Sequence, residues 1–171
     1  MNFLKNYNEN VVEYDLINKF NYKILNKIPK LKSITLTFKL KKSDTKTLIS
    51  SLAALKLLSQ QNPTLNCSKV SNISFNIRKG QPVGCKVNLK KKFLRQFLNV
   101  LINDLSGLKK SINRNETSIF SFKISNILVF HHLEKNYQFF KNLSDLNITV
   151  TTINCKNNEL GFLLKANKLL I

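Results

Sequence analysis

The chain has 171 residues, of which 43% are hydrophobic, so it is long and apolar enough to bury the core of one domain. Its 28 basic and 9 acidic residues give a formal net charge of +19, which an anionic partner has to neutralise. We expect that partner to be nucleic acid rather than an acidic membrane. The basic residues are spread along the chain, and no polybasic cluster adjoins an amphipathic anchor helix.

The N-terminal part of the chain predicts two helices separated by a strand. An N-terminal helix is expected over about residues 5–20, where apolar side chains fall near one stripe. After Pro29, apolar residues alternate with Thr and Lys from Ile34 to Lys41, which indicates an amphipathic strand with a basic polar face. A broad apolar stripe that ends near Ser59 predicts the next helix.

A second alternating pattern runs from Ile73 to Leu89 and predicts a central hairpin. Side chains alternate across a pleated strand, so the apolar residues of both arms can face one core while the polar residues form a basic outer face. In the turn, Gly80 can take a positive φ and Pro82 fixes its own φ. Gly84 carries no side chain that could block a close approach.

The remaining elements follow the hairpin in chain order. Lys90, Lys91 and Lys92 precede a helix expected over about residues 93–105, and positive charge at a helix start is favourable only beside an anion. We then expect a polar connection near 108–115, strands at 120–124 and 127–130, a short helix near 137–143, a strand at 146–150 and a closing helix near 158–169.

These elements predict an α+β fold in a single domain that spans residues 1–171. The sheet is expected to be mainly antiparallel or mixed, with helices on one face. The other face is left as a basic, RNA-facing surface. No internal repeat or low-complexity linker indicates a second domain.

The sequence offers little support for catalysis, and we predict that the protein is not an enzyme. The turn from Gly80 to Gly84 lacks the ending of a P-loop and the spacing of a dinucleotide fingerprint. No carboxylate pair indicates acid/base chemistry. His131 and His132 are adjacent and would point opposite ways on an extended segment, so they could not readily share one metal.

Cysteine usage and amino-acid composition bear on cofactors and on the compartment. The three cysteines, Cys67, Cys85 and Cys155, are odd in number and far apart, so neither a disulfide framework nor a zinc site follows, and we expect no metal and no cofactor. No apolar run is long enough to cross a bilayer. Abundant Asn, Lys and Ile with scarce Gly and Pro are typical of an A+T-rich gene. We therefore predict synthesis in a mitochondrion, with a plastid as the alternative.

The run from Ile77 to Leu89 resembles the signature of a universal family of large-subunit ribosomal proteins that bind 5S rRNA, number five in the bacterial naming. The segments Phe20–Tyr22, Ile28–Leu36 and Leu146–Thr152 resemble the same family in the same order. The resemblance thus covers nearly the whole chain. It implies a structural constituent of an organellar large ribosomal subunit; the alternative is a non-ribosomal organellar RNA-binding or RNA-processing factor.

The resemblance also implies the partners. They are 5S rRNA and adjoining large-subunit rRNA at the central protuberance, peptidyl-site tRNA, neighbouring central-protuberance proteins and a small-subunit bridge protein. In an organelle without 5S rRNA, the same face would hold large-subunit rRNA or a replacement protein.

Candidate RNA contacts are the polar residues of the N-terminal helix, of the strands and of the central turn. Lys and Arg would neutralise phosphates, while Asn and Thr would fix the register on sugars and backbone. Those of the N-terminal helix rest on the resemblance alone. The rRNA candidates are Lys5, Asn6, Tyr7, Lys19, Thr35, Thr37, Lys39, Asn76, Arg78, Lys79, Gly80, Gln81, Gly84, Lys86, Asn88, Lys90, Lys91, Thr149 and Thr151.

By the same resemblance, the later part of the connection before Ser74 faces peptidyl-site tRNA. The candidates there are Ser68, Lys69, Ser71 and Asn72. This loop is densely basic in the family, whereas residues 66–72 of this chain hold Lys69 as their one cation. We therefore expect any tRNA contact to depend on backbone amides and hydroxyls more than on charge. The alternative is a flexible hairpin tip with no partner.

Overall fold

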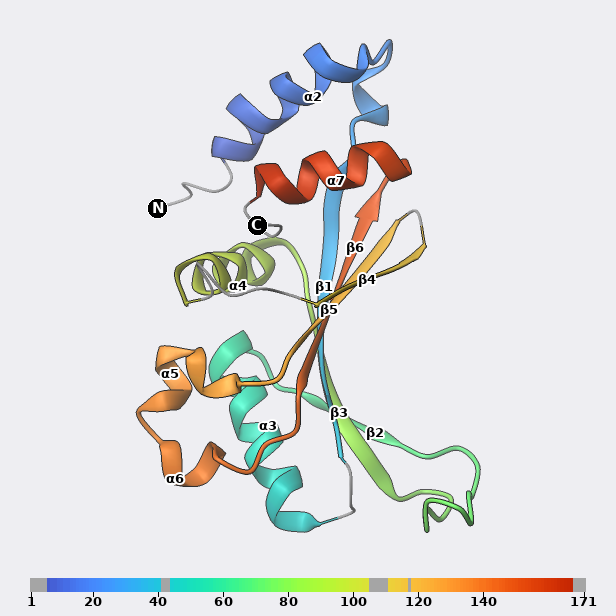
Figure 1. Cartoon of the computed structure of the whole chain (residues 1–171), viewed down its shortest axis with the longest axis vertical. Helices are drawn as coiled ribbons and strands as arrows, with labels where there is room; N and C mark the ends of the chain where they lie inside the picture. Colours follow the sequence, from blue (N-terminus) through green and yellow to red (C-terminus); the bar gives the residue numbers. More distant parts are fainter. Residues whose placement is uncertain (1–5, 41–43, 105–110, 117, 168–171) are drawn as a thin grey trace. The chain divides into compact units, whose positions relative to one another are not determined.

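The computed structural model describes residues 6–40, 44–104, 111–116 and 118–167. It contains one six-stranded sheet with the strand order β2-β3-β1-β6-β5-β4 (Figure 1). Strands that follow one another directly, such as the antiparallel pair β2 and β3, occur together with helices along the chain, so the predicted α+β class is confirmed.

The described helices and strands have the following bounds. The strands are β1 (Lys30–Lys39), β2 (Thr64–Cys67), β3 (Pro82–Leu89), β4 (Ser111–Glu116), β5 (Ile119–Ile124) and β6 (Leu146–Ile153). A π-helix (Asn8–Val12) leads into α2 (Glu13–Phe20), and short 3-10 helices lie at Leu25–Lys27 and Ile127–Val129. The other α-helices are α3 (Thr45–Ser59), α4 (Lys91–Asp104), α5 (His131–Glu134), α6 (Tyr137–Phe140) and α7 (Asn157–Ala166).

The contacts within the chain divide it into two compact units. The first unit consists of Met1–Ile34, Lys90–Phe122 and Thr149–Ile171, and the second of Thr35–Leu89 and Lys123–Ile148. The strands β1, β5 and β6 have residues in both. That residues 1–171 act as a single domain stays a prediction.

In the first unit, α2 and α7 contact one another over an apolar cluster. Its buried members are Val12, Leu16, Ile28 and Leu163. The helix α2 ends at Asn21, which takes a left-handed φ of 50° and donates its backbone N–H to the carbonyl of Ile17 at 2.9 Å. The expected N-terminal helix and closing helix are thus confirmed over the described residues.

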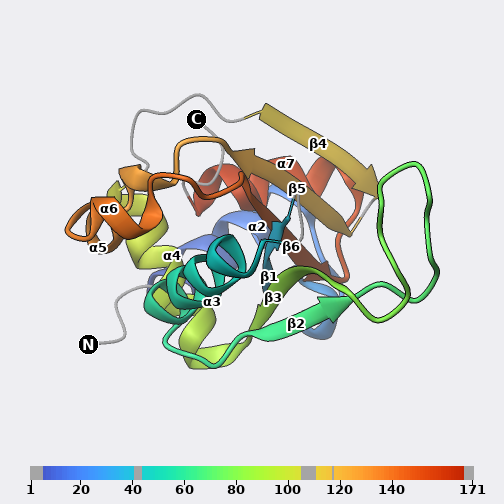
Figure 2. The ribbon, with the colours of Figure 1, turned by 90° about the horizontal axis from the view of Figure 1, so that it is seen from below.

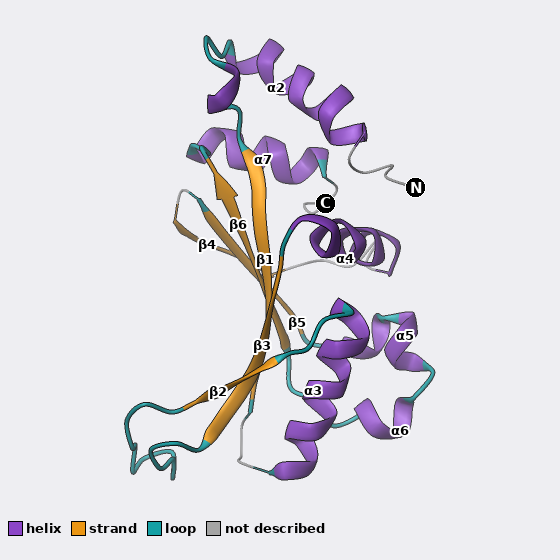
Figure 3. Ribbon diagram, turned by 180° about the vertical axis from the view of Figure 1, so that it is seen from behind, coloured by secondary structure: helices purple, strands orange, loops and turns teal. Residues whose placement is uncertain are grey.

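In the second unit, α3 packs against β3 and buries the apolar side of that strand (Figure 3). The thiol of Cys85 donates to the hydroxyl of Ser51 on α3 at 3.2 Å. Along β3, Cys85, Val87 and Leu89 are buried, whereas Lys86 and Asn88 are exposed. The second arm of the predicted hairpin is therefore confirmed as an amphipathic strand.

The first arm of the predicted hairpin is wrong. Residues 73–79 form no strand, and the partner of β3 is instead β2, which pairs antiparallel with Leu65 opposite Cys85. Ile73 and Phe75 are 93% and 73% exposed. Their alternation lacks a core to face, so the segment turns back on itself through a single bridge between Asn72 and Ile77.

The region after β5 also differs from the prediction. Instead of a strand at 127–130, Ile127–Val129 forms a 3-10 turn in which the Asn126 side chain accepts the Leu128 N–H at 3.2 Å. His131 and His132 then lie on α5 and not on an extended segment. The additional strand is β4, which overlaps the segment expected to be a polar connection. Among the described residues, no group of three or more His, Cys, Asp or Glu side chains is placed to hold a metal ion.

Candidate nucleic-acid interface

A polar sheet face in the second unit carries five of the predicted RNA contacts. Because α3 covers the side of β3 that holds Cys85, Lys86 and Asn88 lie on the opposite side and are exposed. On β1, Leu36 and Phe38 are buried, while Thr35 and Thr37 are half-buried and Lys39 is exposed. We call Thr35, Thr37, Lys39, Lys86 and Asn88 the polar sheet face.

The lysines of the second unit differ in whether a carboxylate of the protein already pairs with them. The ammonium group of Lys123 lies 2.6 Å from a carboxylate oxygen of Asp145, so a protein anion already neutralises it. Lys39 and Lys86 are exposed, and no ion pair between described residues involves either. These two lysines are therefore the stronger candidates for phosphate contacts.

Gly84 lies in β3 rather than in the turn. A Cβ atom at this position would lie 2.3 Å from the carbonyl oxygen of Phe38, which is far inside van der Waals contact. Gly84 is buried, so the close approach that its missing side chain permits is made by the neighbouring strand β1. Gly80, in contrast, has a φ of +88°, and a Cβ atom at this position would have no neighbouring atom within 4 Å.

Residues 68–81 form a long loop between β2 and β3, which Figure 2 shows extending beyond the ends of both strands. Hydrogen bonds close its base. Ser68 donates its N–H to the carbonyl of Gln81 at 2.9 Å and accepts from the N–H of Gly80 at 3.0 Å. The side chain of Ser68 donates to the Arg78 carbonyl at 2.6 Å, and the Gln81 side chain accepts the Arg78 N–H at 2.8 Å. The side chains of Ser68 and Gln81 thus hold the loop in shape.

The tip of the loop has a second, narrower closure. Asn72 and Ile77 exchange two backbone hydrogen bonds, at 2.8 and 3.0 Å. The Asn72 side chain also accepts the Ser74 N–H at 3.0 Å, and Asn76 has a φ of 52°. Asn76 therefore belongs to a turn, as do Arg78 and Lys79 at the loop base, and the expectation that Asn76 and Arg78 project from a sheet is wrong.

The exposed surface of this loop is partly cationic and partly apolar. Its exposed residues include Lys69, Ser71, Arg78 and Lys79 together with Val70, Ile73 and Phe75. Sequence reasoning assigned Ile73 and Phe75 to the core. The signal that it underweighted is the pair Asn72 and Asn76, because Asn favours turns and tolerates the left-handed region.

The predicted contacts of the first unit have mixed surroundings. Asn6 is exposed, but Tyr7 is half-buried against the apolar cluster of α2 and α7, and Lys5 lies outside the described residues. The ammonium of Lys19 lies over the ring of Phe162, 4.6 Å from its centroid, in a cation–π contact. Tyr7 and Lys19 therefore already contact other parts of the protein.

The remaining first-unit candidates lie on β6 and around the start of α4. Thr149 is half-buried on β6. The hydroxyl of Thr151 lies 2.6 Å from that of Ser33 and donates to the Ser33 carbonyl at 3.1 Å, so it joins β6 to β1. Lys90 and Lys91 are exposed, and α4 begins at Lys91 rather than at the expected residue 93.

The polar sheet face, whose lysines have no ion pair among the described residues, and the loop with exposed cations are features typical of strongly basic, nucleic-acid-binding proteins. Within the part of the chain that the structure describes, none of the helices is both long and apolar enough to span a membrane. No protein-family model matches the chain.

Comparison with curated proteins gives the family. Large ribosomal subunit protein uL5m of Reclinomonas americana is 31% identical over 173 residues, which cover 96% of this chain and 94% of the relative. Large ribosomal subunit protein uL5 of Blochmanniella floridana is 32% identical, with 95% and 89% covered. The uL5 protein of Wigglesworthia glossinidia brevipalpis is 34% identical over 168 residues, with 92% and 91% covered.

The chain belongs to the uL5 family of large-subunit ribosomal proteins. This confirms the resemblance carried by Ile77–Leu89 and the prediction that the protein is not an enzyme. Relatives of mitochondrial and bacterial type match at similar identity, so the compartment stays a prediction.

Proposed function

We propose that this protein is a structural constituent of a mitochondrial large ribosomal subunit, where it binds 5S rRNA and adjoining rRNA at the central protuberance. The observation that carries the proposal is the polar sheet face, on which Lys39, Lys86 and Asn88 are exposed while α3 covers the opposite side of β3. A plastid ribosome is the alternative compartment.

The chemistry of this face suits RNA backbone recognition. Lys39 and Lys86 can neutralise phosphates, and Asn88 with the threonine hydroxyls of β1 can bind riboses and phosphate oxygens. A-form RNA displays its 2′-hydroxyls in a wide, shallow groove, which a flat polar surface can follow. Recognition would therefore depend on the shape of the RNA more than on its base sequence.

The same proposal assigns the tip of the loop of residues 68–81 to peptidyl-site tRNA and leaves Arg78 and Lys79 at its base as rRNA contacts. Lys69 is exposed and can meet a phosphate, while Phe75 is 73% exposed and can stack on a nucleobase. The hydrogen bonds at the loop base hold these side chains away from the sheet. A hydrogen-bonded loop with an exposed apolar tip favours a binding partner over the alternative of a flexible tip that binds nothing.

Further partners of the assembled subunit follow from the same placement. They are neighbouring proteins of the central protuberance and a bridge protein of the small subunit. In an organelle without 5S rRNA, the polar sheet face would bind large-subunit rRNA or a replacement protein.

Sedimentation of organelle lysate at moderate and high salt, followed by sequencing of RNA crosslinked to this chain, tests the proposal. We expect the chain to stay with the large subunit and to crosslink to 5S or adjoining rRNA. Free migration with heterogeneous RNA would favour the alternative, a general RNA-binding or RNA-processing factor.

The loop assignment has its own test with a matched control. Phe75→Ala removes an exposed ring from the loop, and Phe139→Ala removes an equally exposed ring from α6, since both are 73% exposed. We expect Phe75→Ala to weaken tRNA binding to reconstituted subunits about fivefold or more, the effect of losing one aromatic stacking partner. Equal affinities of the two variants would remove Phe75 from the tRNA contact.

A further inference from the structure

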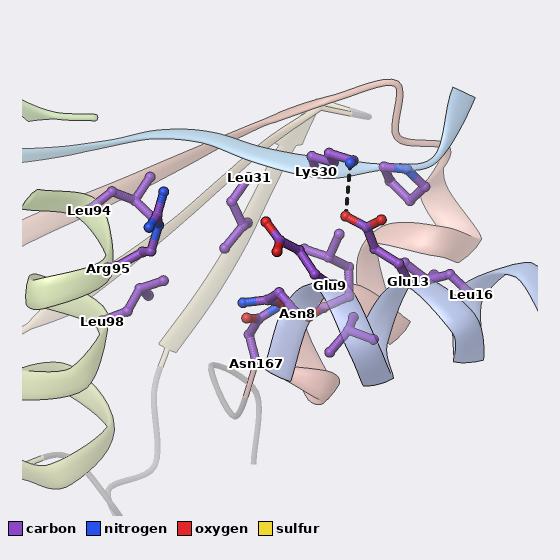
Figure 4. Close-up of a pocket in the computed structure, with 13 residues that line it drawn as sticks. Asn8, Glu9, Glu13, Leu16, Lys30, Leu31, Leu94, Arg95, Leu98 and Asn167 are labelled. Carbon is purple, nitrogen blue, oxygen red and sulfur yellow. Dashed lines mark hydrogen bonds and ion pairs between the residues drawn. The ribbon is translucent and has the colours of Figure 1, made fainter. Parts of the chain in front are cut away.

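Two cavities in the surface of the molecule differ in the charges that line them. The first, of about 200 Å³, lies in the first unit among α2 with its preceding π-helix, the start of β1, α4 and Asn167 after α7 (Figure 4). Two acidic residues, Glu9 and Glu13, and two basic residues, Lys30 and Arg95, line it. The ammonium of Lys30 lies 2.8 Å from a carboxylate oxygen of Glu13. The charges of this cavity thus balance, and it selects neither a cation nor an anion.

The second cavity, of about 360 Å³, lies in the second unit between α3 and α6. These two helices contact one another and lie side by side (Figure 3). The lining includes Lys46 and Ile49 of α3 and Phe139 of α6, and no carboxylate of the described residues is part of it. Ile49 is 64% and Phe139 is 73% exposed. The cavity is therefore open, largely apolar and next to a positive charge, and its volume admits an apolar side chain of another molecule.

The helix α3 has apolar residues on two opposite faces. Its inner face, which includes Leu55 and Leu58, is buried against the rest of the unit. Ile49, Ala53 and Leu57 recur every four residues and therefore share a second face. On that face Ile49 and Leu57 are 64% and 45% exposed, and Ala53 is exposed as well.

The helix α4 shows that an apolar outer face is not general in this protein. The exposed residues of α4 are Lys91, Lys92, Asn99 and Asn103, all of which are polar. A helix at the surface of a protein ordinarily has a polar outer face, whereas a helix that is apolar all round is covered on every side. The composition of α3 is thus that of a helix with a second partner on its outer face.

The charged residues of α3 indicate the chemistry of that partner. They are Lys46 and Lys56, which the helical repeat places on the same side as Ile49, Ala53 and Leu57. Both lysines are exposed, and no ion pair between described residues involves either. They lie about 15 Å apart along the helix axis, at about 1.5 Å per residue. We call these five residues the outer face of α3; its apolar stripe has a cation near each end.

We propose that the outer face of α3 binds an amphipathic helix of a partner protein, in which Asp or Glu residues flank an apolar stripe. The stripe packs on Ile49 and Leu57, and the small Ala53 between them lets the two helices approach closely. An apolar side chain of the partner fills the cavity beside Phe139, while its carboxylates pair with the two lysines. Burial of apolar surface supplies the affinity, and the charge pairs set the orientation. No RNA takes part, so this inference holds or fails separately from the ribosomal proposal.

Fluorescence anisotropy with the isolated full chain tests the proposal. The probe is a fluorescein-labelled helical peptide about five turns long, with Leu and Ala on one face and Glu along both edges of that face. We expect saturable binding at constant ionic strength. A peptide of the same composition in scrambled order has the same charge but no stripe, and it should bind at least about tenfold more weakly. Equal affinities would mean that charge alone attracts the peptide and would overturn the proposal.

Matched pairs of variants locate the binding. Ile49→Ala with Leu57→Ala shortens two side chains of the outer face of α3 and should weaken peptide binding about tenfold or more. Ile24→Ala with Leu65→Ala shortens two side chains elsewhere that are 50% and 49% exposed, and it should leave the affinity unchanged. The thermal midpoints of both proteins show that they fold. Equal affinities of the two double variants would overturn the proposal.

Charge reversal tests the role of the lysines. Lys46→Glu with Lys56→Glu should weaken binding of the Glu peptide and strengthen binding of a peptide with Lys in place of each Glu. Lys23→Glu with Lys27→Glu changes the net charge by the same amount at two exposed positions of the first unit and is the control. Equal effects of the two reversals would show that the net charge of the chain governs binding, and the outer face of α3 would be excluded.

Two other occupants are outcomes of the same variants. A second copy of the chain would present further lysines to Lys46 and Lys56, and like charges repel. A dimer in sedimentation equilibrium that Ile49→Ala with Leu57→Ala dissolves would overturn the proposal in favour of self-association. Flotation with phosphatidylserine vesicles tests a lipid surface. Vesicle binding that the same variant loses, together with unchanged peptide affinity, would assign the face to a membrane instead.

Discussion

The strand β3 and residues 73–77 have the same alternating pattern but different structures. In β3, Val87 and Leu89 alternate with Lys86 and Asn88, and α3 covers the apolar side. In the loop, Ile73, Phe75 and Ile77 alternate with Ser74 and Asn76, yet Ile73 and Phe75 are exposed. An alternating pattern indicates which side chains could be buried on one face of a strand. The strand forms only where other elements pack against that face.

The comparison also explains the choice of partner for β3. The short segment Thr64–Cys67 pairs with it, although Leu65 is 49% exposed and the segment has little apolar pattern. The loop between the two strands then has room for exposed cations and for Phe75. A tight hairpin would have placed these side chains on a sheet instead.

The largest expected difference between the two regions is in stability. Leu89→Ala removes a fully buried side chain and should lower the free energy of unfolding by about 3 kcal/mol. Ile73→Ala removes a side chain that is 93% exposed and should change it by less than about 0.5 kcal/mol. Urea denaturation of both variants measures this. Similar losses would mean that residues 73–77 have a buried partner.

The two glycines give a second contrast. Gly84→Val places a side chain against the Phe38 carbonyl and should cost about 2–3 kcal/mol of stability. In Gly80→Ala the new Cβ atom has no neighbour within 4 Å, but residue 80 has a φ of +88°, which is unfavourable for a residue with a side chain. This substitution should lower the free energy of unfolding by about 1 kcal/mol. Thermal denaturation compares them with Ser74→Ala as a neutral control. A Gly84→Val protein as stable as Ser74→Ala would disprove the close approach.

RNA binding should separate the exposed lysines on β3 and directly after it from the exposed lysines of α3. Replacing Lys86 and Lys90 by Gln should reduce the slope of log affinity against log salt by roughly one unit for each lost phosphate contact. Lys46 and Lys56 on α3 are also exposed, so the same double replacement there is the matched control. Filter binding to 5S rRNA at several salt concentrations measures the slopes. An unchanged slope for the first pair would remove these lysines from the interface.

The smallest expected effect concerns the thiols of the two paired strands. Burial raises the pKa of the Cys85 thiol above its ordinary value of 9.0, partly offset by its hydrogen bonds with Ser51 and the Phe38 backbone. Because folding raises this pKa, the neutral thiol contributes its full stability below about pH 9 and loses it as the pH rises further. Cys85→Val should therefore show a shallower alkaline decline of stability than the parent protein.

Thiol labelling provides the control for this prediction. At pH 8, exposed Cys67 should react quickly with a disulfide reagent, whereas buried Cys85 should react only when the sheet opens. Replacing Cys67 by Ser should remove the fast phase and leave the alkaline decline as it is. Fast labelling of both thiols would contradict the burial of Cys85.

The sequence by itself determined those helices and strands whose apolar residues recur with a regular spacing and are buried by another element. Stripes of period 3.6 predicted the helices α2, α3, α4 and α7, and alternation predicted β1, β3, β5 and β6. The run Ile77–Leu89 identified the family, and the charge of +19 indicated an RNA partner. These are properties of local spacing or of composition, which no distant contact can alter.

Only the tertiary structure decided what each pattern packs against. It paired β3 with Thr64–Cys67, left Phe75 exposed and placed Gly84 against the Phe38 backbone. It also brought Glu9 and Asn167 to one cavity, although they are far apart in the sequence. Such neighbours depend on which surfaces exclude water together, and the burial of a side chain is a property of the assembled chain rather than of its own segment.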